Sequence, residues 1–358
     1  MTPAPIRVGL IGFGFAGRTF HAPLIGAVSG LEIVAVASSD AARVYAVLPN
    51  AAVTASAETL AVDCGVDLVV IASPNATHAP LTLRALAAGK HVVVDKPFAV
   101  TLGEARAMVA AADTHGRLLA VFHNRRWDSD FLSVAAVVAA GKVGRIAHLE
   151  SHFDRFRSQV RDRWRERAEP GAGIWYDLGP HLVDQALCLM GMPDGITLDR
   201  AAQREGAQAD DWAHAVLHFG NARAVLHSSM LVAGGGKRFT VHGDAGSLVK
   251  ANPDQQEAQL IAGMTPGAPG WGEDSDPFLL FDAEGRPSQL SALAGDQSRF
   301  YAGVRDAIRD GAPNPVPPIE ALAVMAVIEA GIRSAAEGRH VEIPLTHAER
   351  DAYARSRR

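Results

Sequence analysis

The sequence contains only two cysteines and no long apolar run. Cys64 and Cys188 lie far apart and belong to no Cys-x-x-Cys pair or cysteine–histidine cluster, so we predict two buried thiols and no metal site. Apolar runs such as Val66–Ala72 have the length of a strand, and none reaches the ~20 residues that a membrane helix needs. Met1–Pro5 carries no basic region followed by an apolar stretch, so no secretory signal is expected.

An excess of positive charge is also absent. The chain has 34 Lys and Arg residues and 39 Asp and Glu residues, so its net charge is -5. This balance argues against a surface that binds nucleic acid. Apolar residues make up 48% of the chain and charged residues 20%, an ordinary balance for a globular protein. At 358 residues the chain predicts two domains. We expect a cytoplasmic protein with neither membrane nor nucleic acid as a partner.

Residues 1–122 alternate short apolar runs with helix-forming stretches. Strands that are apolar throughout are typical of a parallel sheet covered by helices on both faces. We therefore predict an α/β fold that begins with a doubly wound Rossmann domain over residues 1–122. The predicted strands are Ile6–Gly12, Leu31–Ser38, Val66–Ser73, His91–Asp95 and Arg117–Val121, and the predicted helices are Ala16–Ala27, Ala79–Ala88 and Leu102–Ala112.

Residues 123–358 are predicted to form a second, α+β domain with an open, largely antiparallel sheet. Gly243–Gly246 supplies a turn between two β-rich runs. Gly263–Gly272 is expected to be a surface loop, and the polar tail Arg350–Arg358 is expected to fray. The predicted strands are Arg145–Phe153, Ala213–Phe219, Ala222–Leu231, Arg238–His242 and Ser247–Lys250, and the predicted helices are Phe131–Ala139, Leu178–Met190 and Glu320–Ala335.

A glycine-rich turn, Gly12-Phe13-Gly14-Phe15-Ala16-Gly17, joins the first strand to the first helix. In such a turn Gly12 permits the tight bend, Gly14 lets the backbone approach a pyrophosphate, and Gly17 lets helix and strand pack closely. Backbone N–H groups and the positive helix end then face the phosphates. A glycine turn without a ligand is the alternative, and the position at the start of a βαβ series disfavours it.

The second strand ends in Ser38-Ser39-Asp40, where the residue that contacts the adenosine ribose is expected. An acidic residue there would bind the 2′-hydroxyl and select NAD. Ser38 and Ser39 instead leave room for a 2′-phosphate, and Arg43 supplies a charge. Asp40 favours NAD unless it caps the next helix. We predict NADP, with NAD as the alternative.

Lys96 follows the strand His91–Asp95 in the stretch Val94-Asp95-Lys96-Pro97. Open α/β sheets bind ligands at the carboxyl ends of their strands, so Lys96 is expected in that crevice. A lysine there stabilises a developing alkoxide or holds a hydroxyl. The alternative is an ordinary surface lysine.

Asp177 and His181 are four residues apart, so a helix presents them on one face. Hydride transfer at a carbinol needs a proton donor or acceptor, and histidine serves in both directions near neutral pH. The alternative is that Asp177 caps the helix and His181 is a core histidine. Asp184 also falls on this face, without a separate role.

A third stretch, Phe122–Trp127, lies at the predicted domain junction, with Asp154-Arg155 and Arg161–Arg165 beyond it. Arginine forks, carboxylates and an aromatic ring are suited to hydroxyl-rich ligands. Alternating charges on a solvated surface are the commoner cause of such runs.

Together these stretches resemble the Gfo/Idh/MocA oxidoreductase family over essentially the whole chain, and most closely its branch of NADP-dependent scyllo-inositol dehydrogenases. The glycine turn alone is not specific, whereas the combination in this order and spacing is. The residues that carry the resemblance are Gly12–Gly17, Ser73-Pro74-Asn75 with His78, Gly89–Pro97, His123–Trp127 and Tyr176–His181.

The resemblance implies a Rossmann domain followed by an α/β domain whose open sheet covers the nicotinamide and often forms the subunit interface of a homodimer or homotetramer. Lys96 corresponds to the lysine of the family's Glu-Lys-Pro motif, with Asp95 in place of the usual glutamate and an expected cis Lys96–Pro97 bond. Asp177 and His181 correspond to the family's Asp-x-x-x-His pair, with the histidine as proton donor or acceptor. Close relatives often carry Arg at the position of Ser39.

The resemblance also implies the remaining binding residues. The cofactor is expected along Ser73, Pro74, Asn75, His78, Asp95, Lys96 and Asn124, and the substrate along Lys96, Arg125, Asp154, Arg163, Trp164, Tyr176, Asp177 and His181.

Three functions are compatible with these observations. The first is an NAD(P)-dependent enzyme that transfers a hydride between nicotinamide and a polyol or sugar, with substrate held by Lys96, Asp177 and His181. The second is a non-catalytic NAD(P)-binding sensor, which has no reason to keep those three residues together. The third is another oxidoreductase of this fold, such as an aldose dehydrogenase or a biliverdin-type reductase. An arginine-rich pocket favours a polyol or sugar over a flat apolar tetrapyrrole.

Overall fold

The computed structural model describes residues 4–357. Two predictions, on Met1–Pro5 and on the tail Arg350–Arg358, therefore concern segments that lie partly outside the described residues. The chain divides into two compact units, each built from three segments. The first unit comprises the chain up to Asn124 with residues 256–271 and 296–322, and the second comprises Arg125–Gln255, Gly272–Gly295 and the chain from Ala323.

The two later segments of the first unit depart from the predicted domains 1–122 and 123–358. Their elements are α8 (Gln256–Ile261) and α9 (Ser298–Asp310). Phe300 and Tyr301 of α9 are fully buried, and their rings lie 5.1 and 5.7 Å from that of Phe122. Through these aromatic contacts, α9 completes the core of the first unit, although it lies more than 170 residues after Phe122 in the sequence.

The first unit contains a six-stranded, all-parallel sheet in the order β3-β2-β1-β4-β5-β6. This is the strand order of a dinucleotide-binding Rossmann fold, and it confirms the predicted fold class. The predicted strands are all present, with ends that differ by up to two residues, and the three-residue β3 was not predicted. The strands are β1 (Ile6–Ile11), β2 (Leu31–Ala37), β3 (Ala52–Thr54), β4 (Leu68–Ile71), β5 (His91–Val94) and β6 (Leu119–Val121).

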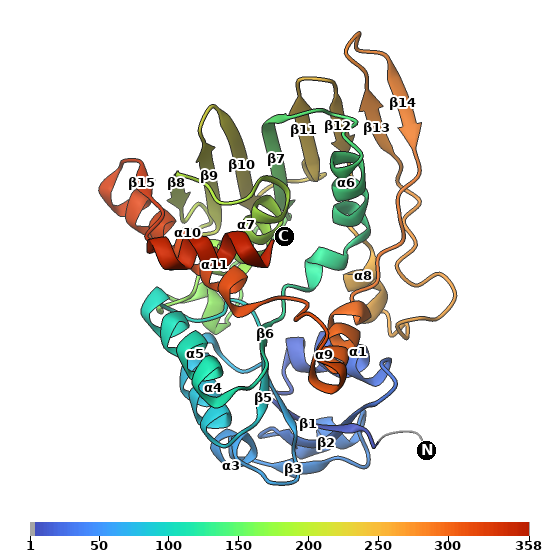
Figure 1. The fold of residues 1–358 in the computed structure, drawn as a ribbon, viewed down its shortest axis with the longest axis vertical. Coiled ribbons are helices and arrows are strands. Elements are labelled where there is room, and N and C mark those ends of the chain that lie inside the picture. The colour runs from blue at the N-terminus through green and yellow to red at the C-terminus, as the bar shows by residue number, and fades with distance from the viewer. Residues whose placement is uncertain (1–3, 358) are drawn as a thin grey trace. The chain divides into compact units, whose positions relative to one another are not determined.

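Helices connect these strands, and α4 and α5 lie side by side along the sheet (Figure 1). The first predicted helix is a π-helical turn, η1 (Gly17–His21), that continues as α1 (Ala22–Gly26). The predicted helices near Ala79 and Leu102 are α4 (His78–Ala87) and α5 (Leu102–His115). Two five-residue helices, α2 (Ala41–Tyr45) and α3 (Ala57–Ala61), were not predicted.

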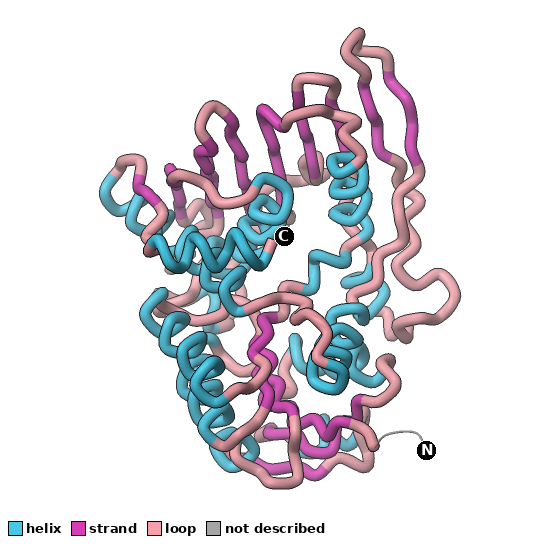
Figure 2. The backbone as a smooth tube through the Cα atoms, viewed as in Figure 1, coloured by secondary structure: helices cyan, strands magenta, loops and turns pink. Residues whose placement is uncertain are grey.

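The second unit contains a nine-stranded sheet in the order β14-β13-β12-β11-β7-β10-β9-β8-β15. Its strands are drawn in magenta in Figure 2. Only the pair β7–β10 is parallel, so the predicted largely antiparallel sheet is confirmed. The strands are β7 (Ile146–Asp154), β8 (Gly195–Ala201), β9 (Trp212–Phe219), β10 (Ala222–Ser229), β11 (Phe239–Gly243), β12 (Ser247–Lys250), β13 (Phe278–Phe281), β14 (Pro287–Leu290) and β15 (Val341–Glu342).

Helix α7 (Ile174–Met190) packs on β7, β9 and β10. Along β7 the side chains alternate, so that Leu149 and Phe153 are buried while His148 and His152 lie on the opposite face. Three further α-helices are α6 (Ser129–Ala139), α10 (Pro318–Glu337) and α11 (His347–Ser356).

The expected frayed tail is wrong, because residues 347–356 form α11. Thr346 and Glu349 make a capping box at its start. Tyr353 is buried and donates a hydrogen bond to the carbonyl oxygen of Leu187 at 3.1 Å. The prediction of two buried thiols is also wrong, since Cys64 is exposed in the turn before β4 and Cys188 is half-buried.

Candidate functional site

The glycine turn lies at the carboxyl end of β1. Gly12 has φ +94°, and a Cβ there would lie 2.6 Å from the carbonyl oxygen of Ala72. A Cβ on Gly17 would collide with the Gly12 carbonyl, whereas Gly14 has open space beside it. The turn thus closes against its own backbone at two glycines and leaves the third approachable, which fits a dinucleotide pyrophosphate. Within the same turn Phe13 is buried and Phe15 is exposed.

The end of β2 carries the residues expected at the ribose. Asp40 caps α2, where its Oδ1 accepts the backbone N–H of Arg43 at 2.9 Å. Its other oxygen lies 3.0 Å from Nη2 of Arg43, so that guanidinium is already paired. Ser38 Oγ accepts the backbone N–H of Asp40, and Ser39 is exposed. The alternative of Asp40 as a helix cap is therefore confirmed.

The carboxyl ends of β4 and β5 bring together Ser73, His78 and the Asp95–Pro97 turn. His78 is buried, with Nδ1 2.8 Å from the carbonyl oxygen of Pro97 and Nε2 3.0 Å from that of Ser73. Lys96 is half-buried, and the Lys96–Pro97 bond is cis as expected. Close to Ser73, Pro74 is exposed and Asn75 is buried.

Asp95 is a buried carboxylate whose Oδ1 accepts the backbone N–H of Lys96 at 2.7 Å. Burial acts to raise the pKa of Asp95, but hydrogen bonding to His21 and the charges of His21 and Lys96 bring it down to about 2. The group is therefore ionised at neutral pH. Asn124, at the end of the same unit's first segment, is buried and donates from Nδ2 to Gln297 Oε1 at 2.9 Å.

Helix α7 places Asp177 and His181 one turn apart in the second unit. The helix begins at Ile174, so Asp177 lies in its first turn, and the interpretation of Asp177 as the cap is wrong. Asp210 serves the helix start instead: its carbonyl oxygen accepts the N–H of Ile174, and its Oδ2 accepts that of Trp175 at 2.9 Å. Burial raises the pKa of Asp210, although these bonds and Arg200 act against the shift.

His181 is buried, and its ring meets Phe153 edge-on with centroids 6.3 Å apart. Arg125 lies over the same Phe153 ring at 4.9 Å and pairs with Asp128 at 3.1 Å. Asp177 Oδ1 lies 3.6 Å from Nε of Arg165. An imidazole, a carboxylate and two guanidinium groups are thus gathered around the first two turns of α7, as a polar substrate requires.

The arginine-rich segment before α7 is held by its own ion pairs. Arg163 pairs with Glu166 at 2.6 Å, and Arg165 lies over the Trp164 ring at 4.6 Å. Arg163 and Asp177 line one small recess, which also includes Arg165. Tyr176, next to Asp177, is half-buried.

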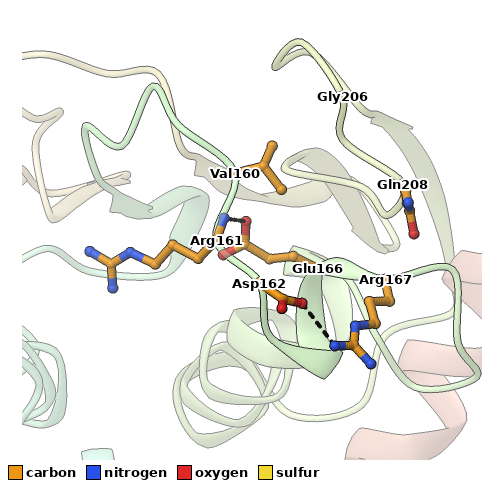
Figure 3. Close-up of a pocket in the computed structure, with 7 residues that line it drawn as sticks. All are labelled: Val160, Arg161, Asp162, Glu166, Arg167, Gly206 and Gln208. Atoms are coloured by element: carbon orange, nitrogen blue, oxygen red, sulfur yellow. Dashed lines mark hydrogen bonds and ion pairs between the residues drawn. The ribbon is translucent and has the colours of Figure 1, made fainter.

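A larger pocket of about 500 Å³ opens beside this segment (Figure 3). Its lining includes Arg167, which binds Asp162 at 2.8 Å, and Glu166, which accepts the backbone N–H of Arg161. Burial acts to raise the pKa of Glu166, and the bonds from Arg161 and Arg163 lower it overall. Neither Asp177 nor His181 lines this pocket.

The structure does not bring Asp154 to His181. Asp154 follows Phe153 on β7, so its side chain lies on the opposite face of the sheet, because strand side chains alternate. There it faces His152 at 3.5 Å and His227 at 3.7 Å. Asp154 and Phe153, the neighbour of His181, thus lie on different faces of the sheet.

The sequence analysis did not predict several contacts between polar side chains. Arg126 binds Asp184, Gln185 accepts from Arg238, and His21 contacts Tyr301. Each partner comes from a distant segment, so no local motif marks it. Among residues 4–357 no His, Cys, Asp and Glu cluster is arranged to hold a metal ion. Over the same range, no helix is long and apolar enough to cross a membrane.

Comparison with known proteins finds two family models that together match most of the chain. A family model described as "Oxidoreductase family, NAD-binding Rossmann fold" covers residues 6–123, and one described as "Oxidoreductase family, C-terminal alpha/beta domain" covers residues 135–343. YdgJ, an uncharacterized oxidoreductase of Escherichia coli, is 50% identical over 92% of this chain and 96% of its own.

Two further relatives are similar over nearly their whole length. IolW of Bacillus subtilis, named scyllo-inositol 2-dehydrogenase (NADP(+)), is 34% identical over 94% of this chain and 95% of its own. The crystal structure of an oxidoreductase from Klebsiella pneumoniae superposes with a TM-score of 0.94 at 50% identity, over 99% of this chain and 100% of that one.

Proposed function

Because the chain belongs to the Gfo/Idh/MocA oxidoreductase family and carries an NAD(P)-binding Rossmann domain, we propose that it is an NADP-dependent dehydrogenase of polyols or sugars. The observation that carries this proposal is the polar cluster on α7, where Asp177 pairs with Arg165 and His181 lies beside Phe153. Such a cluster suits a ligand with several hydroxyls. The printed name of IolW agrees with this substrate class.

In the proposed reaction, His181 accepts the proton of the substrate hydroxyl during oxidation and returns it during reduction. Asp177 binds a neighbouring hydroxyl, and Arg165 keeps that carboxylate in place. Lys96 donates to the reacting oxygen and stabilises its developing negative charge. When bound, the nicotinamide accepts or supplies the hydride.

The residues proposed for the cofactor are Gly12–Gly17 at the pyrophosphate, Ser38 and Ser39 at the ribose, and Ser73–Asn75, His78 and Asn124 beyond. NADP is favoured because Asp40 is engaged as the cap of α2 and as the partner of Arg43. A carboxylate so occupied is poorly placed to accept a ribose 2′-hydroxyl. We further propose a homodimer or homotetramer, which the mass of the native protein in solution tests.

The deciding experiment is a panel of inositols, other polyols and aldoses with NADP and NAD, followed by the absorbance of the reduced nicotinamide. We expect turnover of at least one polyol or sugar, with NADP preferred. Lys96→Met should abolish that turnover, whereas Lys142→Met, at an exposed lysine, should not change it. Binding of NADP without turnover of any member of the panel would contradict the proposed activity and favour a sensor.

A further inference from the structure

A buried polar group in the first unit joins three segments that are far apart in the sequence. His21 comes from η1, Asp95 follows β5, and Tyr301 lies in α9. The side chains of His21 and Tyr301 are fully buried, and that of Asp95 is 10% exposed. Nδ1 of His21 lies 2.5 Å from the hydroxyl of Tyr301, and Nε2 lies 3.8 Å from Oδ2 of Asp95.

The charge states of Asp95 and Tyr301 follow from their surroundings. Asp95 is ionised, and the His21 nitrogen that faces it is Nε2, 3.8 Å from Oδ2. Burial, with the charge of Asp95, raises the pKa of Tyr301 well above its usual range, so its hydroxyl stays protonated. The phenol therefore keeps its proton, and the imidazole of His21 lies between this phenol and the carboxylate of Asp95.

Aromatic packing fixes the ring plane of His21. Its centroid lies 4.3 Å from that of Phe122, and Phe122 in turn contacts the ring of Tyr301. The imidazole therefore has few alternative rotamers, and its Nε2 stays on the side of the carboxylate.

The carboxylate of Asp95 connects His21 to the backbone of Lys96. Its Oδ1 accepts the backbone N–H of Lys96, while Oδ2 faces His21. On the other side of Lys96, the carbonyl oxygen of Pro97 lies 2.8 Å from Nδ1 of His78. We infer that His21 and Tyr301 are positioning residues for Lys96, which they hold through Asp95. This inference rests on the proposed function, because it gives Lys96 its role.

Two substitutions of His21 separate positioning from mere packing. His21→Gln places an amide nitrogen near the position of Nε2 and keeps a donor to Asp95, whereas His21→Asn places it near Nδ1 and keeps only the contact with Tyr301. We expect His21→Gln to retain kcat within about threefold and His21→Asn to lose ~10-fold or more, because small displacements of a catalytic group are costly. The Kd for NADPH should be unchanged in both, and Tyr301→Phe should fall between them.

Equal losses of kcat in the two variants, in step with equal losses of thermal stability, would mean that His21 only fills the core. The variant Lys96→Met tests the proposed role of Lys96 separately from the positioning role of His21. If that variant keeps its turnover, the proposed role of Lys96 fails; if it is inactive while His21→Asn is fully active, only the positioning inference fails.

A second readout needs no substrate. Limiting acetic anhydride modifies accessible amines, and peptide mass spectrometry gives the rate at Lys96 in each variant. We expect an altered rate, by threefold or more, in His21→Asn and the wild-type rate in His21→Gln. Identical rates in the wild type and both variants would overturn the inference even if no polyol is turned over.

Discussion

Arg126 donates hydrogen bonds to both carboxylate oxygens of Asp184, from Nη2 to Oδ1 at 2.6 Å and from Nε to Oδ2 at 2.9 Å. Both side chains are mostly buried. The pair ties the short helix η3 (Asn124–Trp127) to the middle of α7, the helix that carries Asp177 and His181. A two-pronged arginine–carboxylate pair fixes direction as well as distance, so it sets how α7 lies on its unit.

Asp184→Asn should therefore destabilise the protein strongly. The substitution leaves a buried guanidinium without its counter-charge, which costs about 3–5 kcal/mol of unfolding free energy. Urea unfolding followed by circular dichroism measures the change. The control is Asp162→Asn, whose carboxylate is 90% exposed in its pair with Arg167 and should cost under ~1 kcal/mol. Similar values for the two variants would contradict the structural role of the buried pair.

His181→Ala should retain NADP binding and lose turnover by ~10²-fold or more, as the loss of a proton acceptor implies. Steady-state kinetics gives turnover, and fluorescence titration with NADPH gives binding. His347→Ala, at an exposed histidine in α11, should leave both unchanged. Full activity of His181→Ala would remove this residue from the reaction.

Ser39→Arg should increase the preference for NADP. Arg43 is already paired with Asp40. A new guanidinium at the exposed position 39, near the end of β2, would add a positive charge that is available to a 2′-phosphate. One charge-assisted hydrogen bond contributes about 1.5–3 kcal/mol, which corresponds to ~10-fold or more in the ratio of kcat/KM for NADP and NAD. Ser39→Gln adds length without charge and should leave the ratio near that of the wild type. Equal ratios in both variants would mean that the 2′-position is recognised elsewhere.

The Rossmann unit was predictable because its signals are local. Buried parallel strands are apolar throughout, and the glycine turn needs only six consecutive residues. The elements that were missed, such as β3 and α2, are three to five residues long, too short to show a period. The return of α9 to the first unit was not predictable, since Phe300 and Tyr301 read as the apolar face of any helix.

The candidate site divides in the same way. Lys96 and the Asp177–His181 pair stand in motifs, so the sequence marks them. The place of Asp154 could not be read from the sequence, because strand alternation, visible only once the register of β7 is known, puts it on the face opposite Phe153. The partners that hold the site, Gln297 for Asn124 and His21 for Asp95, come from distant segments that no local pattern connects.

Two half-buried histidines of the second sheet should make stability depend on pH. Burial lowers the pKa of His214 on β9 and of His227 on β10 below the ordinary value of 6.5. Their rings lie 5.4 Å apart. The unfolded chain therefore takes up protons at these positions at a higher pH than the folded protein does, so the stabilisation present above about pH 6.5 is lost as the pH falls.

The double variant His214→Asn, His227→Asn should therefore lose less stability than the wild type on acidification below this value. Each proton taken up only by the unfolded chain contributes a slope of about 1.4 kcal/mol per pH unit, and the variant lacks two such groups. Urea unfolding at a series of pH values between neutral and mildly acidic gives the two slopes. His115→Asn, at an exposed histidine of α5, is the control and should keep the wild-type slope. If the double variant also keeps that slope, these histidines are protonated equally in the folded and unfolded chains, and the acid sensitivity has another source.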